Sequence, residues 1–154
     1  MQATLDKVRD LAIDLRTGVP RSARAKLGGY VIAARALDKC RADLVGWQGE
    51  YHYDCPLSHI FLDFAGIDAG VFRDFVATGA TDDEVGAWIK AHAKQQEAIE
   101  VVRFNNTWRD KRLSDLDDRL QGFVEGYVDE NCPPGVRIYT FFDVYDAEEG
   151  RIKA

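Results

Sequence analysis

The chain has 154 residues and a formal net charge of −6, with 46% hydrophobic and 30% charged residues. A chain of this length and composition is expected to form one domain with a sizeable core. Its acidic balance disfavours nucleic-acid binding. No stretch approaches the roughly 20 apolar residues that a membrane helix needs, so we expect neither nucleic acid nor membrane as a partner.

Basic and acidic residues are distributed unevenly along the chain. Residues 1–45 hold nine Lys or Arg against five Asp or Glu, a net charge of +4. Residues 46–154 hold eleven against twenty-one, a net charge of −10. Either the two parts attract each other across the fold, or the basic part binds a small anion.

The cysteine content indicates a reducing compartment. The chain has three cysteines, Cys40, Cys55 and Cys132, with no CxxC pair. An odd number without paired spacing fits reduced thiols in the cytoplasm better than a disulfide framework. Asp6 and Asp10 interrupt the N-terminal segment, so we expect no signal peptide.

Helical spacing of apolar residues predicts two N-terminal helices. The first covers about residues 4–17, and the second opens at Ser22 and runs to Leu44, with Gly28-Gly29 inside its pattern. Each glycine costs a helix about 1 kcal/mol relative to alanine. Either this helix starts after the glycines, or a neighbouring backbone segment or a ligand lies close to them.

Residues 46–55 are predicted to be irregular or extended, and helices are predicted after them. Helix signals favour six to eight helices in one compact all-α domain over residues 1–154. Three of the later helices are expected at residues 56–65, with Pro56 in the first turn, at 68–77 and at 95–109. Two more are expected to start at the capping box Thr81–Glu84 and at a cap residue, Ser114.

The C-terminal segment 136–146 is ambiguous. Its β-branched and aromatic residues allow a strand. Thr140 followed by Asp143 three residues later favours a short capped helix instead, since a lone strand has no evident partner.

Several short motifs resemble the bacterial family DUF5069. The resemblance covers about residues 14–151 and is strongest in the first 60. The family's function is unknown, so the resemblance implies a small bacterial single-domain protein and brings no catalytic residues. The motifs are Asp14-Leu15-Arg16, Pro20-Arg21-Ser22, Lys26-Leu27-Gly28-Gly29, Gly49-Glu50-Tyr51-His52, Cys55-Pro56-Leu57 and Asp146 to Arg151.

The run from Glu50 to Cys55 has the highest density of ionisable side chains of different kinds in the chain. It combines two carboxylates, an imidazole, two phenols and a thiol. If the backbone is extended, Tyr51 and Tyr53 point one way and Glu50, His52 and Asp54 the other.

Metal binding and catalysis are both conceivable at this run. His52, Cys55 and His59 are nitrogen and sulfur ligands of the kind that zinc takes, but their spacing matches no standard zinc motif, so no metal or cofactor is predicted. Cys55 before a helix could instead be a nucleophile with a lowered pKa, and His52 a general base oriented by Glu50 or Asp54.

A second candidate site is the basic cluster before Gly28 and Gly29. Arg21 and Arg24 would flank the start of the predicted second helix, where free backbone N–H groups attract anions. A solvated or ion-paired basic face is the simpler interpretation.

Two functions remain open from the sequence. The first is a cytoplasmic module that binds a small anionic ligand or a protein partner, and the second is a small enzyme that uses His52 as general base or Cys55 as nucleophile. The predicted ligand-binding residues are Arg21, Arg24, Gly28, Gly29, Glu50, Tyr51 and His52.

Overall fold

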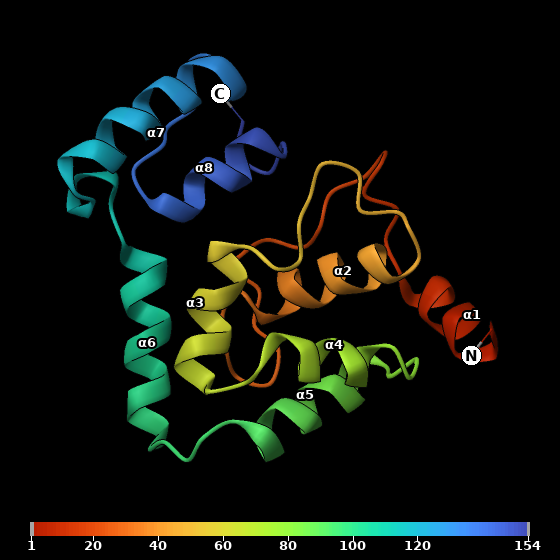
Figure 1. Ribbon diagram of the computed structural model, residues 1–154. Coiled ribbons are helices and arrows are strands. Elements are labelled where there is room, and N and C mark those ends of the chain that lie inside the picture. Colours follow the sequence, from red (N-terminus) through yellow and green to blue (C-terminus); the bar gives the residue numbers. More distant parts are fainter. Residues whose placement is uncertain (1, 154) are drawn as a thin grey trace. The chain divides into compact units, whose positions relative to one another are not determined.

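The computed structural model describes residues 2–153, and these residues contain α-helices and one short 3-10 helix but no strand. The all-α prediction is therefore confirmed. The chain divides into two compact units, Met1–Glu97 and Ala98–Ala154 (Figure 1). That both units belong to one domain stays a prediction.

Within the residues that the structure describes, the first unit contains five helices. They are α1 (Gln2–Leu11), α2 (Ala33–Leu44), α3 (Pro56–Ala65), α4 (Ala69–Val76) and α5 (Asp82–His92). Helix α2 contacts α1, α3 and α4, and Figure 1 shows it in the middle of this unit. Its residues 33–42 are all buried.

Capping residues define the ends of three helices in this unit, as the sequence predicts. Pro56 occupies the first turn of α3, and Gly66 ends that helix with φ 69°. The Asp68 side chain accepts a hydrogen bond from the backbone N–H of Val71 at the start of α4. Thr81 and Glu84 form the predicted capping box of α5.

The two N-terminal helices are shorter than predicted. Helix α1 ends at Leu11 rather than near residue 17. Helix α2 begins at Ala33 rather than at Ser22, because Gly28, Gly29 and Ile32 adopt φ values of 61°, 92° and 74° that no right-handed helix contains. The helix therefore starts after the glycines, which is one of the alternatives that the sequence left open.

An aromatic cluster fills the core of the first unit and fixes the segment that precedes α3. Phe61 packs against Tyr30 and Phe72, with ring centroids 5.5 and 6.3 Å apart. Tyr53 stacks on Phe72 at 5.9 Å and donates a hydrogen bond from its hydroxyl to the carbonyl of Ala69, at 2.7 Å. Segment 46–55 has no helix or strand, as predicted, and is fixed through this buried ring.

The second unit contains α6 (Ala98–Asp110), a 3-10 helix η1 (Leu113–Asp115), α7 (Asp118–Asn131) and α8 (Phe141–Glu148). Asp117, rather than the predicted Ser114, caps α7. Thr140 and Asp143 form a capping box at α8, so the helical alternative for the C-terminal segment is correct from Phe141 onward.

Gly28 packs closely against a neighbouring segment, helix α5, which is the other alternative that the sequence left open. A Cβ atom at Gly28 would lie 2.9 Å from both Cβ and Cγ2 of Ile89 and 3.0 Å from the carbonyl oxygen of Gly86. A Cβ atom at Gly29 would meet nothing within 4 Å. Only the first glycine is therefore required by close packing.

This difference predicts unequal effects of two alanine substitutions. Both glycines have positive φ, so alanine at either position is strained in the left-handed region and lowers the free energy of unfolding by about 1–2 kcal/mol. Gly28→Ala additionally overlaps Ile89, and we expect it to lower the free energy of unfolding by about 1–3 kcal/mol more than Gly29→Ala. Urea unfolding of both variants measures the difference. Equal losses would contradict the packing at Gly28.

Candidate functional site

Helix α2 buries charged side chains on two of its faces. Arg35, Asp38, Lys39 and Arg41 are each at most 4% exposed. Positions 38 and 41 share one face, whereas positions 35, 39 and 43 follow one another at intervals of four on another. Because a buried charge is costly unless it is paired, each face should have specific partners.

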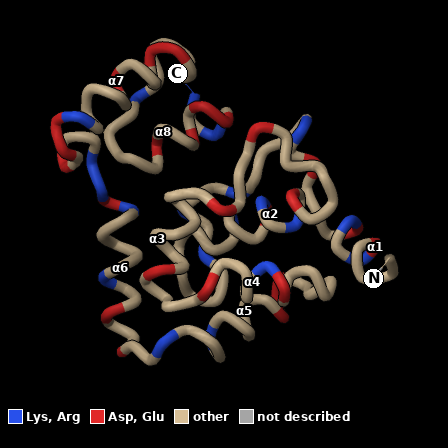
Figure 2. Tube along the Cα trace, in the orientation of Figure 1, with Lys and Arg blue, Asp and Glu red and all other residues tan. Residues whose placement is uncertain are grey.

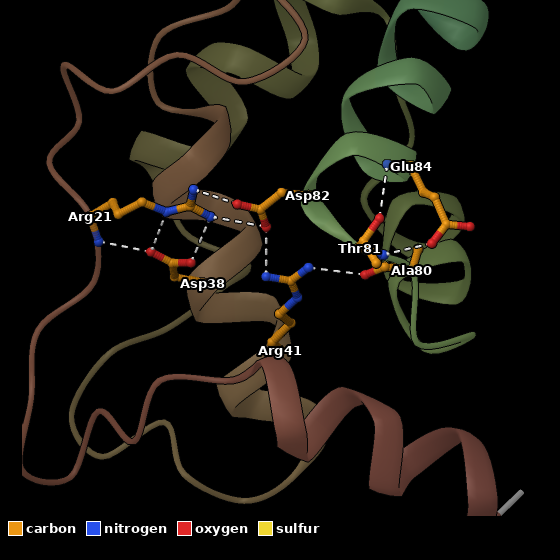
Figure 3. A network of polar contacts seen from close by, with 7 residues as sticks. All are labelled: Arg21, Asp38, Arg41, Ala80, Thr81, Asp82 and Glu84. Atoms are coloured by element: carbon orange, nitrogen blue, oxygen red, sulfur yellow. Dashed lines mark hydrogen bonds and ion pairs between the residues drawn. The ribbon is translucent and has the colours of Figure 1, made fainter.

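The face with Asp38 and Arg41 joins three segments through a polar network. Asp38 accepts hydrogen bonds from the backbone N–H, Nε and Nη2 of Arg21, at 2.8, 3.0 and 2.9 Å. Asp82 at the start of α5 pairs with Arg21 and Arg41, both at 2.8 Å. Arg41 also donates to the carbonyl of Ala80 at 2.9 Å. Figure 3 shows that the two arginines approach Asp82 from different sides.

This network changes the interpretation of the predicted anion site. Arg21 and Arg24 precede α2 by many residues, so the helix N-terminus expected beside them lies elsewhere. The guanidinium of Arg21 is paired with two carboxylates. The backbone N–H of Arg24 donates to Ser22 Oγ in a local turn. Acidic and basic residues occur in both units (Figure 2), and Asp82 supplies the attraction between the basic and acidic parts of the chain.

The second face of α2 meets the chemistry-rich segment. The guanidinium of Arg35 lies over the ring of Tyr51, 5.7 Å from its centroid, and its Nη1 donates to the carbonyl of Arg21. Lys39 Nζ lies 3.0 Å from Cys55 Sγ. Arg35 thus connects the backbone of Arg21 to Tyr51, which brings together two of the predicted ligand-binding positions.

Cys55 is a partly exposed thiol at the N-cap of α3. Burial by itself would raise the pKa of this thiol, but the Lys39 ammonium and hydrogen bonds from the backbone and hydroxyl of Ser58 outweigh it and lower the pKa below its ordinary value. The Ser58 hydroxyl oxygen lies 3.6 Å from the sulfur. A helix N-terminus adds to the preference for a thiolate.

The other two cysteines lack this environment. Cys40 is fully buried, and burial raises the pKa of its thiol to about 12. Burial also raises the pKa of Cys132, which lies in the second unit. Cys55 is thus the cysteine whose surroundings favour the reactive form.

Glu50 and His52 do not assist Cys55 in this structure. Both are exposed, and the hydrogen-bond partners of the Cys55 sulfur are Lys39 and Ser58. His52 instead lines a surface cavity of about 320 Å³ together with Asp43, Tyr53, Asp54, Ala69, Gly70 and Arg73. The predicted catalytic run is therefore divided between two environments.

The spacing of His52, Cys55 and His59 does not produce a metal-ligand cluster. Within residues 2–153, no three His, Cys, Asp or Glu side chains are arranged to hold an ion. His59 instead pairs with Asp54 and with Asp63, and these two hydrogen bonds raise the pKa of His59. Among the described helices, none has the length and apolar character to cross a membrane.

Sequence reasoning missed Lys39, Ser58, Asp43 and Arg73. Lys39 and Asp43 belong to a helix that is recognised by its apolar residues. The local sequence does not indicate which segment these two charged side chains face. The small residues Ala36, Cys40 and Ala42 of α2 were the available signal, since short side chains let neighbouring segments approach the helix.

Comparison with known proteins shows the family of this chain. A family model described as "Domain of unknown function (DUF5069)" matches residues 17–151, so the chain belongs to this family. A search of curated proteins finds no match. The family assignment confirms the resemblance seen in the motifs and leaves the function to be argued from the site.

The polar network predicts a pH dependence of stability. Burial opposes ionisation of Asp82, but Arg21 and Arg41 outweigh it and lower the pKa of this carboxyl. The stabilisation is therefore present above the unfolded-state pKa of about 3.9 and is lost as the pH falls through the lower folded-state pKa. We expect Asp82→Asn to cost on the order of 1 kcal/mol at neutral pH, because its side chain is 44% exposed, and to lose less stability than wild type below about pH 4.

Asp83→Asn is the matched control, measured by urea unfolding at pH 7, 5, 4 and 3. Asp83 shares the first turn of α5, and within the described residues it pairs with no arginine. If the free energy of unfolding of Asp82→Asn fell with decreasing pH as steeply as that of wild type, the ion pairs of Asp82 would contribute nothing to the pH dependence.

Proposed function

We propose that this protein is a reactive-thiol protein, in which the Cys55 thiolate exchanges with small-molecule disulfides. The observation that carries the proposal is the 3.0 Å contact between the buried Lys39 ammonium and Cys55 Sγ at the N-cap of α3. This is the second of the two functions that the sequence left open, with Lys39 in place of His52 as the activating group.

The contact favours the charged form of the sulfur. Lys39 is 4% exposed, and its ammonium, 3.0 Å from the sulfur, attracts a thiolate much more strongly than a neutral thiol. This attraction lowers the pKa of Cys55, and the partial exposure of Cys55 leaves the sulfur accessible to a small reactant.

Thiol–disulfide exchange suits this arrangement best, because it needs no proton relay. The Cys55 thiolate attacks one sulfur of the disulfide, a new S–S bond forms, and the original S–S bond breaks to release the other half as a thiolate. A free thiol reverses the step. Acyl transfer would also need a general acid for the leaving group, and His52 is not among the partners of Cys55.

A mixed disulfide with the small molecule is the expected product. Cys40 is buried with its pKa raised, which makes it a poor resolving thiol. All three cysteines are free, which supports a reducing compartment such as the cytoplasm of a bacterium. Under oxidising conditions the partly exposed Cys55 thiolate would be the first thiol to be modified.

Alkylation by iodoacetamide tests the activation of Cys55. Peptide mass spectrometry follows Cys55 and Cys132 in the same sample between pH 5 and 10. We expect the rate midpoint for Cys55 to lie below the ordinary thiol pKa of about 8.5 and that for Cys132 to lie above it. Lys39→Met should move the Cys55 midpoint upward, whereas Lys39→Arg, which keeps the charge, should retain most of the shift.

The reaction class has a separate test with oxidised glutathione. Wild type should gain one glutathionyl group on the Cys55 peptide, and dithiothreitol should remove it. Cys55→Ser should gain none at this position. A Cys55 midpoint no lower than that of Cys132 would reject the activated thiolate, while normal alkylation without glutathionylation would reject only the exchange reaction.

A further inference from the structure

We infer that the cavity beside segment 52–54 binds a small zwitterion that carries both a carboxylate and an ammonium group, as a free amino acid does. Three elements form it. Asp43 comes from the end of α2, His52 and Asp54 come from the segment before α3, and Arg73 comes from α4. A volume of about 320 Å³ lies at the low end of ligand pockets and suits a molecule of metabolite size.

The charges that line this cavity are of both signs. Arg73 and His52 can bind a carboxylate, and Asp43 and Asp54 can bind an ammonium group. A simple anion would be repelled by the two carboxylates, and a simple cation by the guanidinium. A ligand with both charges satisfies the whole lining, which is why we favour it over the purely anionic ligand expected from the sequence.

The charged groups of the cavity retain unused hydrogen-bonding capacity. Arg73 uses Nη1 for its ion pair with Asp43, and in residues 2–153 its other N–H groups have no protein acceptor. A guanidinium has five N–H donors, so the Nε–Nη2 edge can hold a carboxylate through two parallel hydrogen bonds. The side chains of Arg73 and Asp43 are 37% and 35% exposed, which leaves them within reach of a ligand.

The rest of the cavity wall is fixed in place. The Tyr53 hydroxyl donates to the carbonyl of Ala69, which ties the segment to the first turn of α4. Ala69 and Gly70 have little or no side chain, so a ligand can approach the helix backbone there. Asp54 is held by His59 through one oxygen, and its carboxylate is otherwise exposed. These contacts preorganise the polar groups before a ligand arrives.

Binding of the twenty free L-amino acids tests the inference, by thermal shift and then by titration calorimetry of those that stabilise the protein. We expect at least one to raise the melting temperature, because a ligand that binds only the native state stabilises it. For that amino acid, the N-acetyl derivative and the carboxamide each lack one charge. Each should bind at least about tenfold more weakly, which corresponds to about 1.4 kcal/mol.

Variants locate the site and separate it from Cys55. Arg73→Met and Asp54→Asn should each weaken binding at least about tenfold, whereas the exposed Arg137→Met in the second unit should leave it unchanged. Asp54 is exposed, so its variant keeps the inference testable if Arg73→Met does not fold. Cys55→Ser should still bind, because the cavity does not depend on the proposed thiol chemistry.

Three results would overturn the inference. One is the lack of a melting shift with any of the twenty amino acids in the wild-type protein. Another is binding that survives in Asp54→Asn with unchanged affinity. Binding of the N-acetyl derivative as tightly as of the amino acid would likewise exclude the ammonium contact with the carboxylates.

Discussion

The first unit depends on the burial of charged side chains along α2. Arg35, Asp38, Lys39 and Arg41 are removed from water on a helix whose other buried residues are mostly alanine. A buried charge is costly unless it is paired, and these side chains contact segments without regular structure and helix ends. The charges of α2 therefore act as fixed points to which residues 21 and 51–55 and the start of α5 are attached.

These attachments explain how long irregular segments keep one conformation. The residues between α1 and α2 form no helix, and the β-branched Ile32 adopts φ 74°, a strained value for such a residue. Ile32 is 1% exposed, and its N–H donates to the carbonyl of Ala23 at 2.8 Å. Burial of its side chain and the Arg21–Asp38 pair together offset a conformation that the local sequence disfavours.

The sequence predicts the elements whose ends are set by local chemistry. Helix α3 behind Pro56, the capping box of α5 and the helical C-terminal segment all follow from residues within one turn of the boundary. Prediction fails at the start of α2, where Ser22 has a suitable cap residue type but the chain must pass Gly28 close to Ile89 before the helix begins. Tertiary contact decides that boundary, and a single sequence does not contain it.

The candidate site divides in the same way. The residue types between Glu50 and Cys55 identify the segment, and the position of Cys55 before Pro56 predicts its helix cap. Their partners come from α2 and α4, and no local pattern pairs Lys39 with Cys55 or Arg73 with Asp43. Burial also alternates along the segment, since Tyr53 is buried between the exposed His52 and Asp54. Residues of this one segment therefore contribute to two separate environments. Tyr51 and Cys55 interact with the charged side chains of α2, whereas His52 and Asp54 line the cavity.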